Sequence, residues 1–229
     1  MPTTREEVLT LLGIIASFAG VLTLFWQGYV AVGILVIIVG VLLVWHYIVL
    51  DQPEFTLLEV NKTIFLNDAR GHSATLIRQH KARANHKGIT EFWIKGISSD
   101  GVIGKILIDD KPPDYQGVDC GDVVVCKRFK RPLQRGQEDE LTLSYDIEDG
   151  FLRDSETFIH SVAHKTKHLR MAVRCPSDRP IRSARASLRY GGHMHKALPN
   201  LKISENGCKA ELIVRKPKLG EQYYLEWDW

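Results

Sequence analysis

Two clusters of basic residues, each with aromatic side chains close by, are the parts of this sequence best suited to chemistry. Residues 78–88 read RQHKARANHKG and run into a segment that contains Trp93, and residues 127–131 read KRFKR. Guanidinium groups bind phosphates through paired hydrogen bonds, and aromatic faces stack on nucleobases. The clusters therefore predict a nucleotide-binding site made of Arg78, Arg83, Trp93, Arg128 and Arg131.

Each basic cluster also has a simpler interpretation. The strands of a β domain commonly direct alternate charged side chains to solvent. Cations close to a membrane also face anionic lipid headgroups. The part of the chain after residue 50 carries 29 basic and 25 acidic side chains, a net charge of about +4. That excess suits an anionic ligand or an anionic surface, and it does not separate the two.

Histidines at regular spacing are the nearest approach to a metal site. His160, His164 and His168 recur every four residues, and His193 and His195 follow further along. On a helix the first three would share one face, but the local sequence favours strands, which break that geometry. We therefore predict no metal site, and interpret these residues as core or solvated histidines.

Motifs of the common enzyme classes are absent. The sequence has no phosphate-binding Walker loop, no GxGxxG, no HExxH and no GxSxG. It therefore predicts no enzyme and no cofactor. The cysteines form no CxxC pair, and we expect free thiols in a reducing compartment. They are Cys120, Cys126, Cys175 and Cys208.

The elements that must position these side chains are strands. After Pro53, short alternating or β-branched runs are separated by Gly, Pro, Asn and Asp. The predicted strands cover residues 55–60, 63–66, 74–83, 89–96, 102–108, 122–129, 141–147, 157–162, 169–174, 184–190, 209–215 and 223–227. This pattern predicts an all-β domain over residues 53–229, a closed barrel or sandwich of roughly 8–12 antiparallel strands. In its last strand Tyr223, Leu225, Trp227 and Trp229 share one face, which predicts that this strand closes the core.

The N-terminal part of the sequence has a different character, because residues 8–50 contain no Asp, Glu, Lys or Arg. Residues 8–26 would span roughly 28 Å as a helix, close to the ~30 Å of a bilayer core. Residues 30–50 supply a second apolar run, so residues 1–52 are predicted to form a membrane α-helical hairpin. A cleaved signal peptide is the alternative for the first run, but no basic n-region precedes it and no small-residue cleavage site follows it.

The basic residues that flank the apolar runs predict an orientation. Arg5 precedes the first run, Lys62 and Arg70 follow the second, and residues 27–29 between the runs carry no charge. The excess of basic residues on the cytosolic side of membrane proteins therefore predicts that both termini and the β domain are cytosolic. The predicted location is the bacterial inner membrane, which the chain crosses more than once.

Small residues recur along both apolar runs. Such residues let transmembrane helices approach closely, either within one hairpin or between protomers of a homo-oligomer. The predicted membrane-packing residues are Gly13, Ser17, Gly20, Gly33 and Gly40.

An N-terminal pair of apolar helices, a short turn and a β-rich domain together resemble the two-transmembrane β-barrel (2TM-β) effectors of bacterial CBASS-type antiphage immunity. The resemblance covers the whole chain as an arrangement. It implies that the β domain senses a cyclic nucleotide second messenger and controls oligomerisation of the hairpin, which disrupts the membrane. The implied partners are that nucleotide, the lipid bilayer and further copies of the chain, with no DNA or RNA. A related arrangement, in which the nucleotide restrains the effector, fits equally well.

Two departures from this family stand out. The β domain is larger than a minimal eight-stranded barrel, and its basic residues do not align with the family's ligand contacts. The alternative function is a constitutive membrane-anchored β domain that binds a protein or lipid partner without catalysis. A membrane enzyme comes third, because the sequence supplies neither a recognisable nucleophile nor a metal site.

Overall fold

The structure is a computed structural model, and it describes residues 12–17, 33–34, 36–43, 53–190 and 196–229. The chain divides into two units, residues 1–52 and residues 53–229.

In the first unit the described residues are helical. The Ser17 hydroxyl donates to the carbonyl of Gly13 at 2.8 Å, a contact within one turn. A Cβ atom placed on Gly40 would lie 3.8 Å from Cγ2 of Ile15, whereas one on Gly13 or Gly33 would meet no atom within 4 Å. Gly40 is thus the small residue with a close neighbour among the described ones.

The predicted transmembrane hairpin needs correction. Within the residues that the structure describes, no helix has both the length and the apolar character required to cross a membrane. An uncharged apolar run crosses a membrane only as one continuous helix of about 20 residues, and the described residues contain no such helix. The fold class and the multi-pass inner-membrane location predicted from these runs were therefore wrong. Gly20 and much of the two runs lie outside the described residues.

The second unit consists of strands in three hydrogen-bonded sheets. The seven-stranded sheet has the order β12 (Leu201–Ile203), β13 (Lys209–Arg215), β9 (Thr166–Arg174), β1 (Phe55–Leu66), β2 (Ser73–Ala84), β7 (Glu138–Glu148) and β4 (Val102–Ile108). The four-stranded sheet has the order β11 (Lys196–Ala197), β10 (Ser183–Arg189), β14 (Gln222–Asp228) and β8 (Ser155–Ser161). The three-stranded sheet has the order β3 (Ile89–Ile97), β6 (Asp122–Leu133) and β5 (Tyr115–Asp119).

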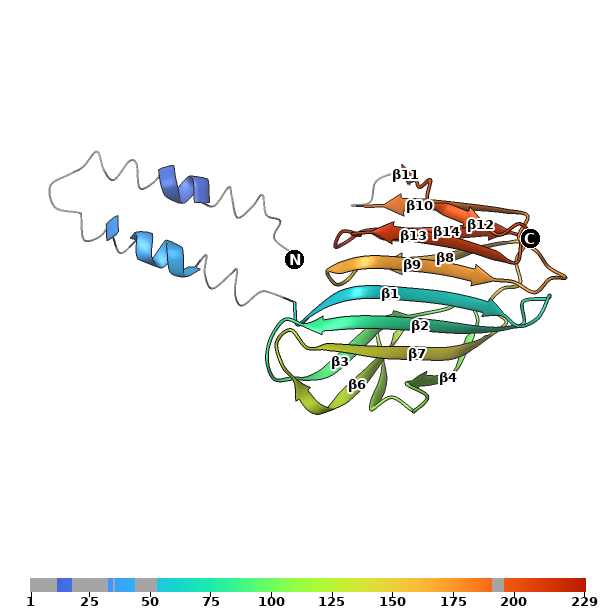
Figure 1. Ribbon diagram of the computed structural model, residues 1–229, viewed down its shortest axis with the longest axis horizontal. Helices are drawn as coiled ribbons and strands as arrows, with labels where there is room; N and C mark the ends of the chain where they lie inside the picture. The colour runs from blue at the N-terminus through green and yellow to red at the C-terminus, as the bar shows by residue number, and fades with distance from the viewer. Residues whose placement is uncertain (1–11, 18–32, 35, 44–52, 191–195) are drawn as a thin grey trace. The chain divides into compact units, whose positions relative to one another are not determined.

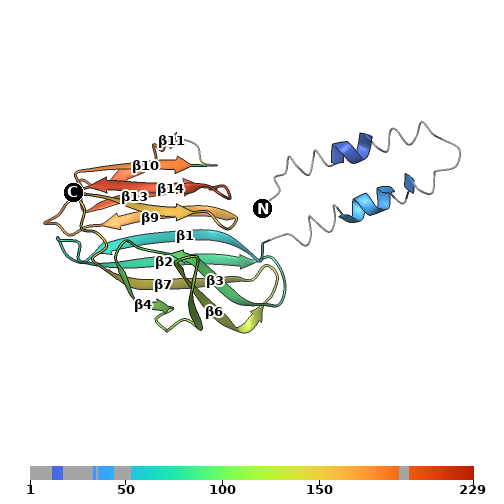
Figure 2. The same cartoon turned by 180° about the vertical axis from the view of Figure 1, so that it is seen from behind.

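The two smaller sheets cover one face of the seven-stranded sheet, as the two opposite views in Figure 1 and Figure 2 show. The four-stranded sheet lies over the half that contains β9 and β13, and the three-stranded sheet lies over the half that contains β2 and β7. The unit is therefore sandwich-like, with its strands in separate sheets in place of the single closed sheet that was one predicted option. The pairing of β1 with β9 is parallel, which also departs from the predicted all-antiparallel arrangement.

The longest hairpin of the unit joins β1 to β2. Its turn is held by Asp68, whose carboxylate accepts hydrogen bonds from the backbone amides of Arg70, His72 and Ser73 at 2.7, 3.3 and 2.6 Å. The sequence had predicted two strands, 55–60 and 63–66, where β1 runs without a break. The hairpin therefore carries residues 61 and 62 as part of a ladder.

The core lies between the layers. The last strand was predicted to close it, and this is confirmed: Tyr223, Leu225, Trp227 and Trp229 are all buried. On the seven-stranded sheet the inward positions of β1 and β2 are mostly apolar. Lys62 on β1 and Arg78 and His80 on β2 interrupt this apolar pattern, and they form the candidate site.

Candidate functional site: a buried cationic cluster

Lys62 and Arg78 lie directly opposite each other on β1 and β2. Opposed residues of an antiparallel pair share a face of the sheet, with Cβ atoms about 4.5–5.5 Å apart. That face is the inner one, because Ile64 opposite Leu76 and Val60 opposite His80 flank the pair and are buried. Two cations therefore lie side by side on the inner face of the seven-stranded sheet, Lys62 buried and Arg78 half-buried.

The surroundings of this pair supply no compensating charge. In the same row of the sheet Lys62 is followed by Met171 on β9, and Arg78 by Leu143 on β7, and both are fully buried. Among the described residues no carboxylate forms an ion pair with Lys62 or Arg78. Like charges opposed on a sheet are destabilising, and buried charges are normally paired. The pair therefore has the character of a site that an anion completes.

The Lys62 ammonium group has two weak partners. It donates to the backbone carbonyl of Ile159 at 3.0 Å and lies 4.5 Å from the ring centroid of Phe158, both from β8 in the opposite layer. Burial, and secondarily the charge of Arg78, hold the pKa of Lys62 well below its ordinary value. An anion placed beside it would favour the protonated form and reverse this shift.

Two buried histidines complete the cluster. His80 is 2% exposed and His160 is 5% exposed. Burial lowers the pKa of both imidazoles well below the ordinary value, and Arg78 and Lys62 lower both further. Both rings are therefore neutral at pH 7. His80 Nδ1 is buried and has no hydrogen-bond partner among the described residues.

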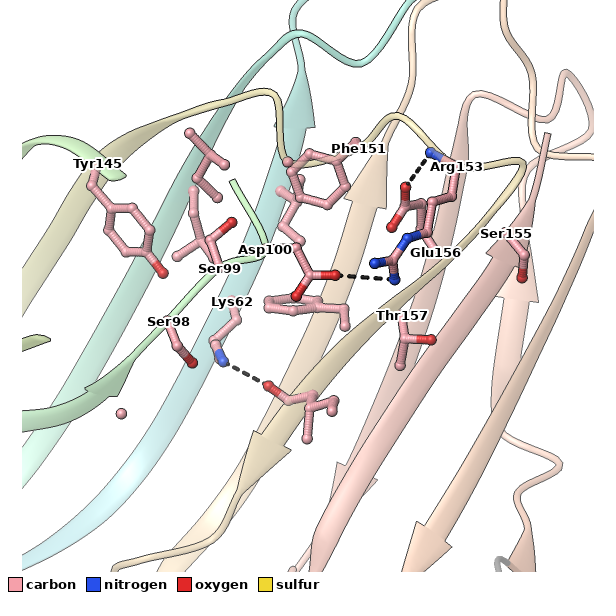
Figure 3. A pocket seen from close by; sticks show the side chains of 17 residues that line it. Lys62, Ser98, Ser99, Asp100, Tyr145, Phe151, Arg153, Ser155, Glu156 and Thr157 are labelled. Carbon is pink, nitrogen blue, oxygen red and sulfur yellow. Dashed lines mark hydrogen bonds and ion pairs between the residues drawn. The ribbon is translucent and has the colours of Figure 1, made fainter. Parts of the chain in front are cut away.

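A cavity of about 370 Å³ opens beside Lys62, where the two smaller sheets meet over the seven-stranded one. Its lining comes from β1, β2, β7 and β8, from the end of β3 and from the segments that join β3 to β4 and β7 to β8, and Figure 3 shows many of these side chains. Polar and aromatic groups that face it include Ser98, Ser99, Tyr145, Phe151 and Thr157. Burial raises the pKa of Tyr145 to about 12, so its phenol remains a hydrogen-bond donor at neutral pH. The volume lies at the lower end of the roughly 300–1,000 Å³ range of small-molecule sites.

A linked group of charges lies on the same cavity. Arg153 Nη1 is 3.1 Å from a carboxylate oxygen of Asp100, and the Arg153 amide donates to Glu156 at 2.8 Å, as the dashed lines in Figure 3 show. Burial raises the pKa of Glu156. Gly101 lets the segment that carries Asp100 pack this closely, because a Cβ there would lie 2.2 Å from the carbonyl oxygen of Glu148. The cavity lining thus combines two cations, Lys62 and Arg153, with the carboxylates of Asp100 and Glu156, and Arg78 lies beside Lys62 on the neighbouring strand.

The residues predicted from sequence do not all come together. Arg78 is half-buried on the inner face of β2, Arg83 is half-buried on the same strand opposite Glu138 of β7, and Arg131 is exposed on β6. Trp93 and Arg128 lie on the outer side of the three-stranded sheet. That sheet therefore separates these two residues from Lys62 and Arg78.

The outer side of the three-stranded sheet carries its own cluster, centred on Trp93 and Tyr115, whose rings are 5.4 Å apart. Arg128 pairs with Glu91 at 3.1 Å, and its amide donates to Asp114 at 2.6 Å. The carboxylates around Arg128 already neutralise it. This surface therefore suits a phosphate less well than the interior pair does.

Sequence reasoning missed Lys62, His80 and the segment that carries Ser98. The sequence did contain a pattern that indicates an inward-facing lysine. Lys62 lies two residues after Val60 and two before Ile64, so it shares their strand face, and lysine is unusual on a buried face. This pattern was lost when residues 61 and 62 were interpreted as a break between strands. His160 was noticed, but for its spacing to His164 and not for the strand face that it occupies.

The described residues contain no group of three or more His, Cys, Asp or Glu side chains placed to hold a metal ion. His160 lies on β8 and His168 on β9, in different sheets. His193 and His195 fall outside the described residues.

Comparison with known proteins gives little further information. No protein-family model and no curated protein matches the chain. Among solved structures, an M1 zinc metallopeptidase from Deinococcus radiodurans is similar at a TM-score of 0.42 and 10% identity, over 75% of this chain and 42% of that one. A yeast LTA4 hydrolase is similar at a TM-score of 0.44 and 8% identity, over 76% of this chain and 29% of that one. The chain spans less than half the length of either protein, and likenesses at this level carry no argument about function.

Proposed function

We propose that residues 53–229 form a receptor for a cyclic nucleotide, with the phosphate bound at Lys62 and Arg78. The observation that carries the proposal is the opposition of these two cations on the inner face of the sheet, with no carboxylate of the described residues paired to either one. A phosphate supplies the missing charge, and hydrogen bonds between charged groups are the stronger ones in proteins. His80 adds a buried donor that has no partner among the described residues.

The rest of the cavity favours a nucleotide over a bare anion. Tyr145 and Phe151 offer aromatic surface, and Ser98, Asp100 and Glu156 offer hydrogen-bonding groups of the kind that recognise a base. The volume of about 370 Å³ suits one nucleotide unit. A cyclic mononucleotide, or one half of a cyclic dinucleotide, is therefore the expected occupant.

The proposed role is binding without catalysis. It retains from the resemblance to antiphage effectors the idea of a cyclic nucleotide signal, and the resemblance alone supports the further expectations of oligomerisation and a role in defence. Whether the nucleotide activates or restrains the protein depends on which state binds it more tightly.

Calorimetric titration of the full chain with cyclic AMP, cyclic GMP, cyclic di-AMP, cyclic di-GMP and inorganic phosphate tests the proposal. At least one nucleotide should bind more tightly than phosphate, since the base adds contacts. If no nucleotide in the panel binds, the proposal fails. If phosphate binds and no nucleotide does, Lys62 and Arg78 form a site for a simple anion, and the assignment to a nucleotide fails.

A second function, recognition of a protein partner, is favoured by the outer side of the three-stranded sheet. Trp93 and Tyr115 are 41% and 50% exposed there, and β5 is an edge strand that pairs with β6 alone. Tyr, Trp and Arg are the residues most enriched at the centres of protein interfaces. Substitution of Trp93 by Ala should abolish such an interaction and leave nucleotide binding intact.

A further inference from the structure

Cys175 and Cys208 lie opposite each other, just beyond the paired residues of β9 and β13. Arg174 is registered with Lys209, and the amide of Cys175 donates to the carbonyl of Cys208 at 2.9 Å, which extends the ladder by one residue. Opposed side chains of an antiparallel pair share a face. Hydrogen-bonded pairs have Cα atoms about 5.5 Å apart, inside the 4.4–6.8 Å range of disulfides.

The two thiols differ in access. Both are free, Cys175 is 8% exposed, and Cys208 is partly exposed. Burial, with the neighbouring Cys208 thiol as a second cause, raises the pKa of Cys175 to about 12. Cys208 Sγ lies 3.6 Å from the carbonyl of Asn206 in the turn that precedes β13. Cys208 is therefore the thiol that a soluble oxidant meets first.

We propose that Cys175 and Cys208 form a dithiol modification site, which a small disulfide oxidant such as oxidised glutathione converts into an intramolecular disulfide. The Cys208 thiolate attacks one sulfur of the oxidant and releases the first thiolate. Cys175, after losing its proton, then attacks Cys208 Sγ, and the second thiolate leaves. The two protein protons end on the two released thiols, so that two protein thiols are oxidised and one oxidant disulfide is reduced.

The bond would close the segment 176–207 into a loop. This segment leaves the seven-stranded sheet after β9, contributes β10 and β11 to the four-stranded sheet, and returns to the seven-stranded sheet as β12. A cross-link that restricts such a loop in the unfolded chain raises the stability of the folded one. Oxidation should therefore raise the melting temperature. This inference does not depend on the proposed function.

The other two cysteines, Cys120 and Cys126, serve as internal controls for the proposed pair. Cys120 is exposed in the turn between β5 and β6, while Cys126 on β6 is registered with Tyr115 and Trp93 and has no cysteine opposite it. If exposure alone governed reactivity, Cys120 would react first. If placement governs disulfide formation, only Cys175 and Cys208 should become linked to each other.

The test is incubation of the full chain with oxidised glutathione, followed by proteolysis without reductant and mass spectrometry. We expect one cross-linked peptide pair, containing Cys175 and Cys208, and a higher melting temperature that reductant reverses. Cys208→Ser should lose both effects, and Cys120→Ser should keep both. A cross-link that involves Cys120 or Cys126, or a Cys175–Cys208 pair that stays reduced at equilibrium with the oxidant, would overturn the proposal. The peptide map of the wild-type protein shows by itself which cysteines become linked, so the proposal is tested even if Cys208→Ser folds poorly.

Discussion

The Arg78 side chain donates from Nε to Nε2 of His80 at 2.6 Å. A guanidinium group can only donate, so Nε2 must be the acceptor, and the proton of the neutral imidazole is on Nδ1. That N–H is buried and has no acceptor among the described residues. An unsatisfied buried donor costs about 1–3 kcal/mol.

The buried histidines predict that the protein loses stability in mild acid. His80 and His160 have folded-state pKa values well below the ordinary 6.5. As the pH falls below that value, these histidines become protonated in the unfolded chain while they stay neutral in the folded chain. Their stabilising contribution is complete above about pH 6.5 and is lost as the pH falls. Each histidine should lower the free energy of unfolding by up to about 1.4 kcal/mol per pH unit below that point. Urea titrations between pH 7.5 and 5 measure this slope.

The double variant His80→Gln, His160→Gln should show a much shallower slope over the same pH range. His168→Gln, on the exposed face of β9, provides the matched substitution outside the cluster. Equal slopes in wild type and the double variant would show that these two imidazoles do not titrate as the buried cluster requires.

Lys62→Met should make the ligand-free protein more stable and the receptor non-functional. Methionine keeps the length of the side chain and removes a buried charge opposite Arg78, although the hydrogen bond to the Ile159 carbonyl is lost. The free energy of unfolding at pH 7 should rise by about 1–2 kcal/mol. Chemical denaturation of ligand-free protein measures it.

Lys81→Met is the control for that substitution, because Lys81 lies on the same hairpin but pairs with Glu138 and Glu140 on the surface. It should lower stability slightly and leave ligand affinity unchanged. A large loss of stability in Lys62→Met would indicate that Lys62 is a structural residue, with its hydrogen bond and ring contact outweighing its burial.

Features of the fold that depend only on neighbouring residues could be predicted from the sequence, whereas features that depend on the pairing of distant segments could not. The final strand was predicted from alternation alone, because burial of Trp227 and Trp229 needs only that one face meets the core. The β5, β11 and β12 strands were missed, since they are five, two and three residues long and have too few positions for an alternation to show. The opposition of Lys62 and Arg78 depends on the register of the β1–β2 hairpin, which no local pattern specifies. The apolar runs before residue 51 predicted two membrane spans, and the described residues contain no helix that could cross a membrane.

Asp100→Asn should tighten nucleotide binding. The Asp100 carboxylate lines the cavity and forms an ion pair with the Arg153 guanidinium group at 3.1 Å. Asparagine would remove the repulsion between this carboxylate and the phosphate, and it would leave Arg153 free to bind the ligand. Because the pair is exposed, the gain should be modest, about two- to fivefold in affinity. Calorimetry at low and moderate salt checks this, and weaker binding would show that Arg153 does not face the ligand.

Binding should be accompanied by proton uptake at alkaline pH. Burial holds the pKa of Lys62 well below its ordinary value, and a phosphate beside the amine favours the protonated form. Titrations at pH 9 in buffers with different ionisation enthalpies should give different apparent binding enthalpies. Lys62→Gln should remove the difference. Identical enthalpies for the wild type would mean that Lys62 does not change its protonation on binding.

The outer-surface residues predicted from sequence should be dispensable for the nucleotide. Trp93→Ala and Arg128→Ala alter the exposed side of the three-stranded sheet, away from the cavity lining. Each should change nucleotide affinity less than twofold. A tenfold loss in both variants would move the site to that surface and remove the interior assignment.

The central claim is that Arg78 binds the phosphate of the ligand, and a thermodynamic cycle tests it most directly. The affinities of the tightest-binding nucleotide and of its nucleoside, which lacks the phosphate, are measured on the wild-type full chain and on Arg78→Lys. Lysine keeps the charge but loses the planar fork of the guanidinium group. We expect the variant to lose about ten- to a hundredfold in affinity for the nucleotide, equivalent to roughly 1.5–3 kcal/mol, and little for the nucleoside. Equal losses for both ligands, or none for either, would contradict the claim.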